Sequence, residues 1–109
     1  MAVRDITYLY HIMECIEKIE AFSADNARDD KTLSAIERQL EIIGEASNTI
    51  SKDFRKEHNH IPWRDIIGTR NKLIHDYLGI RTQTIWEIVE MDLLELKTQI
   101  HTLIQQYEQ

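Results

Sequence analysis

Three side chains near the middle of the chain have the types and spacing for proton transfer beside an anion. Arg70, His75 and Tyr77 form the pattern arginine, four residues, histidine, any residue, tyrosine. An imidazole has an unperturbed pKa of about 6.5, so it takes up and releases protons near neutral pH. A guanidinium stays charged and presents a planar fork of donors to anionic oxygens. The pair therefore supplies an acid–base group and a fixed positive charge.

One straight helix does not bring the three motif residues to one face. At about 100° per residue, Arg70 and Tyr77 lie about 20° apart around a helix, whereas His75 is about 140° from Arg70. Asn71 and His75, four residues apart, do share a face. Either the helix unwinds near His75, or a two-fold axis brings Arg70 of one subunit towards His75 of the other. We favour the second arrangement, which predicts a homodimer.

These polar residues also have structural interpretations. A histidine near a helix end is often a cap or a surface residue, and Arg70 is equally suited to an ion pair with Glu45 or Asp76. Asn71 either orients His75, binds a phosphate or lies on an ordinary exposed helix surface. The motif by itself leaves catalytic and structural roles open.

The charge of the chain is divided unevenly. The whole sequence has a formal net charge of -6, from 13 basic and 19 acidic residues, which argues against indiscriminate binding of nucleic acid. Between residues 52 and 81, however, seven basic residues oppose four acidic ones, giving +3 and leaving -9 for the remainder. This central segment either faces an anion or is a plain solvated helix surface.

Apolar residues at steps of three and four predict three long amphipathic helices, over 5–22, 33–52 and 86–107. No segment alternates with period two over a useful length, so no sheet is expected. With a shorter central helix added, the sequence predicts an all-α, up-and-down helical bundle of about four to five helices. The length is typical of one domain, spanning residues 1–109.

Cap and turn residues predict where the long helices begin and end. Ser34 with Glu37, and Thr84 with Glu87, have the spacing of capping boxes near the starts of the second and third helices. The Asp- and Asn-rich stretch 23–31 predicts a loop after the first helix.

Glycine and proline predict the boundaries of the shorter central helix. Pro62 suits its first turn, Gly68 predicts a bend or a close backbone approach, and Gly79 predicts its end. Gly44, in the second helix, indicates close packing of a neighbouring helix, with a dimer contact or cleft wall as the functional alternative.

The sequence offers little sign of a metal site or of an oxidising or membrane environment. His58 and His60 have no third ligand in view, so they are expected to be solvated loop residues and no metal is predicted. Cys15 is the one cysteine and forms no internal disulfide. No apolar run approaches the roughly 18 residues of a membrane span, and the N-terminus lacks an apolar signal core. A cytoplasmic protein without membrane contact is expected.

The motif and its flanks resemble the signature of the HEPN superfamily. The segments "RQLEIIGEASNTIS" and "IPWRDIIGTRNKLIHDY" are similar to the branch that supplies HepT-like ribonuclease toxins of HEPN/MNT toxin–antitoxin modules. The spacing of Arg70 and His75 is weak alone. Its combination with Tyr77, "IIGEA" and "IPW" in this order is specific, and the likeness runs from about Arg38 to Trp86.

The resemblance implies a homodimeric, metal-independent endoribonuclease toxin without a cofactor, acting on mRNA or tRNA. Its cleft forms where two copies of the motif meet, with Arg70 and His75 as the catalytic pair. RNA carries its own nucleophile, the 2′-hydroxyl, so cleavage needs a base, an acid and positive charge at the phosphate. Asn71 and Lys72 are expected to assist phosphate binding, with Glu45 and Asp76 in support.

Tyr77 has a separate role by resemblance. Its phenol, with a pKa of about 10, is a poor base at neutral pH, and packing against Leu73 is the structural interpretation. In modules of this type a minimal nucleotidyltransferase antitoxin adenylylates the matching tyrosine, and the added negative charge would repel RNA. The alternative from another class is a non-catalytic helical module that docks the nucleotidyltransferase or a nucleotide.

Overall fold

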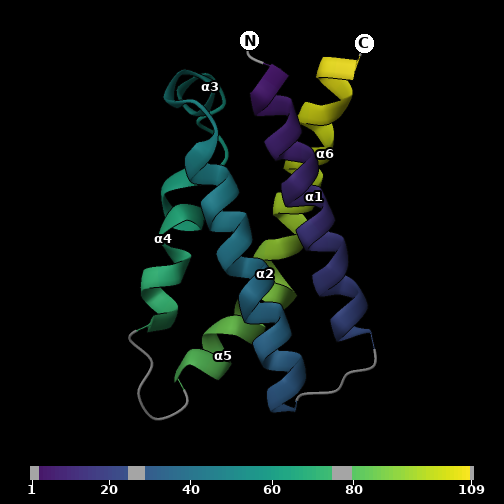
Figure 1. The fold of residues 1–109 in the computed structure, drawn as a ribbon, viewed down its shortest axis with the longest axis vertical. Helices are drawn as coiled ribbons and strands as arrows, with labels where there is room; N and C mark the ends of the chain where they lie inside the picture. The colour runs from purple at the N-terminus through teal and green to yellow at the C-terminus, as the bar shows by residue number, and fades with distance from the viewer. Residues whose placement is uncertain (1–2, 25–28, 75–79, 109) are drawn as a thin grey trace.

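A computed structural model describes residues 3–24, 29–74 and 80–108, and within these ranges it is helical with no strand. Long helices stand side by side, and α5 crosses them at the end opposite the two termini (Figure 1). The predicted all-α architecture is confirmed. The elements are α1 (Val3–Ser23), α2 (Asp30–Thr49), α3 (Lys52–Glu57), α4 (Trp63–Ile74), α5 (Ile80–Glu87), the π-helix η1 (Ile88–Asp92) and α6 (Leu93–Glu108).

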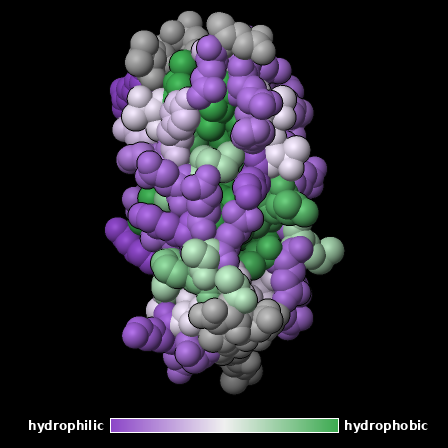
Figure 2. Space-filling model, turned by 90° about the vertical axis from the view of Figure 1, so that its right-hand side faces the viewer, coloured by the Kyte–Doolittle hydropathy of each residue, from purple (hydrophilic) through white to green (hydrophobic). Residues whose placement is uncertain are grey.

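The apolar stripes of the three long helical segments form one core. Leu9, Ile16, Ile36 and Ile100 are each at most 1% exposed, as expected from their helical spacing. At the surface, α1 and α6 run antiparallel and are joined by an ion pair. Lys97 Nζ lies 2.9 Å from Glu20 Oε1. Hydrophilic side chains dominate the face in Figure 2, with apolar ones reaching the surface between them.

The helix starts differ from those predicted by capping boxes. The N-cap of α2 is Asp29, whose carboxylate accepts from the Thr32 backbone N–H at 2.8 Å, so Ser34 lies inside the helix. That hydrogen bond lowers the pKa of Asp29. Thr84 likewise lies inside α5. The predicted 86–107 helix is part of a longer helical run in which η1 widens one turn between α5 and α6.

A short helix, α3, was not predicted; it begins at Lys52, where the second helix was expected to end, and α2 ends earlier, at Thr49. Ser51 is its N-cap, and the serine Oγ accepts from the Phe54 backbone N–H at 3.2 Å. Asp5 of α1, only 2% exposed, accepts from both the backbone N–H and the hydroxyl of Ser51, each at 2.8 Å. One buried carboxylate therefore joins the start of α1 to the start of α3.

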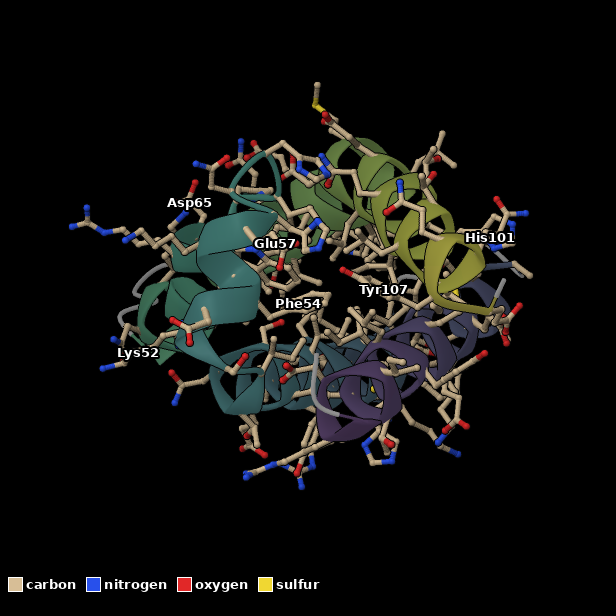
Figure 3. The ribbon with its side chains drawn as sticks, turned by 90° about the horizontal axis from the view of Figure 1, so that it is seen from above. Lys52, Phe54, Glu57, Asp65, His101 and Tyr107 are labelled. Carbon is tan, nitrogen blue, oxygen red and sulfur yellow. The ribbon has the colours of Figure 1, made fainter. Side chains whose placement is uncertain are left out.

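The prediction that His58 is a solvated loop residue was wrong. His58 ends α3 as its C-cap and is half-buried, with its ring 4.5 Å from that of Phe54. Its Nε2 lies 2.8 Å from the hydroxyl of Tyr107 on α6. Figure 3 shows Phe54 and Tyr107 pointing towards each other from α3 and α6. His60 is exposed, as expected.

Gly44 and Gly68 behave differently in the structure. A Cβ on Gly44 would lie 3.2 Å from the backbone oxygen of Ile66. The backbones of α2 and α4 are therefore in close contact at Gly44, as predicted. A Cβ on Gly68 would meet nothing within 4 Å, and α4 continues through it. The predicted close backbone approach at Gly68 was therefore wrong, whereas a bend at this residue stays a prediction. Gly79 lies outside the described residues.

The two glycines yield opposite predictions for stability. Gly68→Ala should raise the unfolding free energy by about 1 kcal/mol, because alanine favours a helix and the site has space. Gly44→Val should lower it by about 2 kcal/mol, because the side chain must displace the α4 backbone. Urea denaturation of both variants measures this. Similar effects at the two positions would contradict the close contact.

Asp5 should contribute strongly to the unfolding free energy of the protein, although it lies near the start of α1. Asp5→Ala removes a charged acceptor of two hydrogen bonds, for an expected loss of about 2 kcal/mol in urea denaturation. Glu17→Ala, an exposed carboxylate on the same helix, serves as the control and should change stability by less than about 0.5 kcal/mol. An equal loss in both variants would refute the role of Asp5.

Candidate functional site

The predicted motif begins in the last turns of α4. Arg70 belongs to this helix, although its side chain lies outside the described part of the chain. Asn71 and Lys72 are exposed, and Lys72 occupies the last turn, where the helix dipole favours a cation. His75, Asp76 and Tyr77 lie outside the described residues, so the convergence of Arg70 with His75 stays a prediction.

Glu45, the supporting residue predicted on α2, lies beside the close contact between Gly44 and α4. Glu45 follows Gly44 directly and is exposed. Its backbone oxygen accepts from the Thr49 hydroxyl at 2.9 Å. An ion pair between Glu45 and Arg70 stays a prediction, since the guanidinium is outside the described part of the structure.

Exposed cations occupy the central elements α3 and α4. Lys52 and Lys56 are exposed on α3, and Arg64 and Lys72 on α4. Lys52 points outward at the edge of the molecule in Figure 3. The positive central segment predicted from the sequence is therefore a surface feature, and these groups can meet an anion without prior rearrangement of the core.

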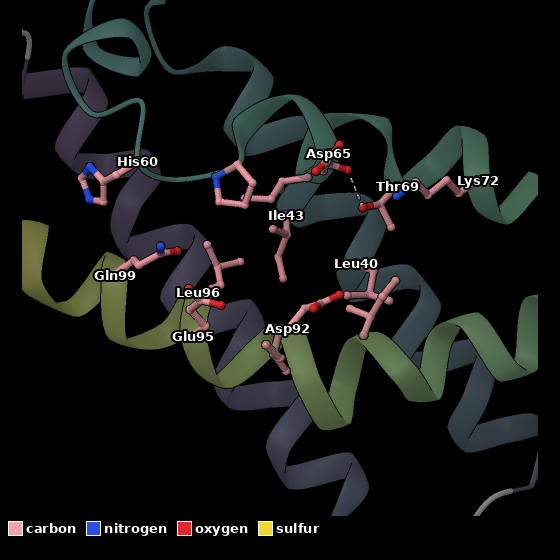
Figure 4. A pocket seen from close by; sticks show the side chains of 14 residues that line it. Leu40, Ile43, His60, Asp65, Thr69, Lys72, Asp92, Glu95, Leu96 and Gln99 are labelled. Atoms are coloured by element: carbon pink, nitrogen blue, oxygen red, sulfur yellow. Dashed lines mark hydrogen bonds between the residues drawn. The ribbon is translucent and has the colours of Figure 1, made fainter.

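A groove that the sequence analysis did not predict lies between α4 and the η1–α6 run, with α2 behind it. Its volume is about 410 Å³. Apolar side chains from all these elements line it, and polar ones border them (Figure 4). The apolar group is Leu40, Ile43, Ile66, Ile88, Leu93 and Leu96; the polar group includes His60, Asp65, Thr69, Lys72, Asp92, Glu95 and Gln99.

The groove takes in one face of α4. Asp65, Thr69 and Lys72 recur at steps of four and three residues and line the groove. Asn71 lies about 200° around the helix from Thr69, and it does not line the groove. The two residues predicted to assist phosphate binding therefore point in different directions, with Lys72 towards the groove and Asn71 away from it.

Two further groups have shifted pKa values. Burial raises the pKa of Tyr107, with Glu57 and Asp5 adding to the effect. Burial also raises the pKa of the Cys15 thiol, while Lys18 opposes this and Glu14 adds to it. Both belong to the packing of the bundle. Within the described ranges, no three His, Cys, Asp or Glu residues come together as a set of metal ligands.

Among the helices whose residues the structure describes, none is long and apolar enough to cross a membrane.

Comparison with known proteins identifies the family. The family model described as "Ribonuclease HepT-like" matches residues 12–103, which include the whole motif from Arg70 to Tyr77. No solved structure matches the chain.

Relatives cover the chain almost end to end. A protein of Caldanaerobacter subterraneus subsp. tengcongensis, named as a candidate RNase, is 41% identical over 90% of this chain and 92% of its own length. One from Thermococcus cleftensis, named as a candidate ribonuclease HepT, is 43% identical over 88% and 92%. A candidate RNase of Methanocaldococcus jannaschii is 36% identical over 100% and 99%. The chain therefore belongs to the HepT-like ribonuclease family of the HEPN superfamily.

Proposed function

We propose that this protein is the metal-independent endoribonuclease toxin of a toxin–antitoxin module. The observation that carries the proposal is the position of the motif: Arg70, His75 and Tyr77 all fall within the residues matched by the ribonuclease family. The exposed cations of α3 and α4 support it, because they give a negatively charged protein a local surface for RNA phosphates.

The proposed reaction needs proton transfer and charge neutralisation. One imidazole removes the 2′-hydroxyl proton as that oxygen attacks the adjacent phosphorus. The bond from phosphorus to the 5′-oxygen breaks, and a protonated group returns a proton to the leaving oxygen. Arg70 offsets the charge that develops on the phosphate oxygens. The products are a cyclic phosphate and a 5′-hydroxyl end.

A homodimer supplies these groups from two copies of the motif. A two-fold axis that brings Arg70 of one subunit towards His75 of the other places two imidazoles and two guanidiniums in one cleft. The base and the acid then need not be the same histidine. Lys72 lies in the last turn of α4 and adds positive charge near this end of the helix.

We further propose that a nucleotidyltransferase antitoxin silences the site through Tyr77. The tyrosine oxygen attacks the α-phosphorus of ATP, pyrophosphate leaves, and an adenylyl group remains on the phenol. Its negative phosphodiester lies two residues from His75 in the sequence, where it repels RNA phosphate. The modification thus uses the same electrostatics that bind the substrate.

RNA cleavage by purified protein tests the catalytic pair. His75→Ala should abolish cleavage, with a loss of at least about 100-fold, because the general base and acid disappear. His101→Ala, on an exposed surface of α6, should cleave as wild type does. Cleavage by wild type should persist in EDTA.

Mixed dimers then test the shared site. A dimer of one Arg70→Ala and one His75→Ala subunit retains one intact pair if each site draws on both subunits, so part of the activity should return. Recovery of none, with both variants folded and dimeric, would contradict a shared site. Cleavage retained by His75→Ala would contradict the catalytic role of His75, and no cleavage by the wild-type dimer would favour a binding module instead.

Silencing is tested with labelled ATP and the partner enzyme. Tyr77→Phe should cleave RNA, incorporate no adenylyl group and resist silencing, because it lacks the phenolic oxygen. Tyr10→Phe, an exposed tyrosine on α1, should be modified and silenced like wild type. Adenylylation of the Tyr77→Phe variant at another residue, with loss of cleavage, would disprove the assignment.

A further inference from the structure

The groove between α4 and the η1–α6 run combines an apolar floor with a polar border. Its floor is Leu40 and Ile43 of α2, which are 4% and 2% exposed. Ile66 on α4 and Ile88 on η1 are only half-buried, so they leave apolar surface open to the groove. Its volume of about 410 Å³ is large enough to receive several anchoring side chains.

The polar residues around this apolar floor carry mostly one sign of charge. Asp65 on α4, Asp92 on η1 and Glu95 on α6 are all exposed, and among the described lining residues they oppose a single ammonium group, that of Lys72. None of the three carboxylates is in an ion pair among the described residues. A ligand with positive charge beside apolar groups would complement both parts of this surface.

The π-helix contributes to this arrangement. A π-helical turn holds an extra residue, so it changes the direction of the side chains on either side of it. In η1, Ile88 and Asp92 line the groove, whereas Met91 is 73% exposed and lies outside its lining. Single π-helical turns of this kind are frequent at functional sites.

We propose that this groove docks a segment of a partner protein that presents apolar side chains flanked by lysine or arginine. An amphipathic helix laid along α4 and α6 is the simplest such segment, with its apolar residues on the floor and its cations against Asp92 and Glu95. This inference goes beyond the ribonuclease reaction, and its test does not require RNA cleavage. The groove shares one residue, Lys72, with those predicted to assist phosphate binding.

Two other occupants fit the groove less well. RNA is a polyanion, and the described lining, with three carboxylates and one ammonium group, repels its phosphates. A second copy of the chain that used the same face across a two-fold axis would bring both sets of carboxylates together without compensating cations. The charge therefore favours a basic protein segment.

The experiment uses the whole protein and a synthetic peptide probe. The probe is an amphipathic helix of about 14 residues, or four turns, with one leucine face bordered by lysines. A second peptide has glutamate in place of each lysine. In NMR titrations of the isotope-labelled protein, the lysine peptide should shift the amide signals of Ile66, Thr69, Asp92 and Glu95. It should bind at least about tenfold more tightly than the glutamate peptide.

Charge reversal in the groove provides the matched comparison. The double variant Asp92→Lys with Glu95→Lys should lose at least about tenfold in affinity for the lysine peptide and gain affinity for the glutamate peptide. Glu14→Lys with Glu17→Lys changes the net charge equally on the exposed face of α1 and should alter neither affinity. All four positions are exposed, so the variants should fold, which circular dichroism checks.

Three results would overturn the proposal. The first is an equal loss of affinity in the α1 control, which would mean that net charge alone attracts the peptide. The second is a shift of the groove amides by a single-stranded RNA of similar length, which would make the groove part of the RNA site. The third is a change of oligomeric state in the groove variant, measured by sedimentation, which would identify a second copy as the occupant.

Discussion

The close backbone contact between α2 and α4 at Gly44 determines where the functional half of the molecule lies. A Cβ at this position would stand 3.2 Å from the Ile66 carbonyl oxygen, an unusually tight contact that would push the two helices apart by a few tenths of an ångström. The contact sets the place of α4 against the core. The placement of α4 in turn determines where the backbone of Arg70 lies, in the last turns of this helix, and where the groove lies.

A second set of contacts holds the opposite end of the bundle together. Asp5 joins α1 to the N-cap of α3, and the His58–Tyr107 contact joins the end of α3 to α6. The Trp63 indole also donates to the backbone oxygen of His58 at 3.0 Å, which ties in the first turn of α4. The short helix α3 thus links three long elements through polar groups, whereas the central core is almost wholly apolar.

The electrostatics of the surface follow this division. Exposed cations lie on α3 and α4, while carboxylates lie on η1 and α6 and on the groove side of α4. The two surfaces adjoin on α4, where Lys72 lies among the groove carboxylates. Because Lys72 and Asp65 are both on α4, this helix belongs to both surfaces.

Periodicity was sufficient to predict the long helices. Apolar residues at steps of three and four form a stripe along one side of a helix, and the helix buries that stripe by turning it towards the core. Periodicity could not predict α3, whose six residues bury only Phe54 and whose start depends on Ser51 and the distant Asp5. Capping boxes misled because Asp29 and Ser34 are both competent caps, and in the structure Asp29 caps α2.

The sequence by itself determined the helical class, the apolar core and the family, because these depend on local spacing and on the order of short motifs. Only the tertiary structure decided that Gly44 touches a backbone while Gly68 does not, that His58 packs on Phe54 and contacts Tyr107, and that Asp65, Asp92 and Glu95 surround one groove. Each of these involves residues that are distant along the chain. Their proximity results from how whole helices pack, and no local pattern of residues encodes it.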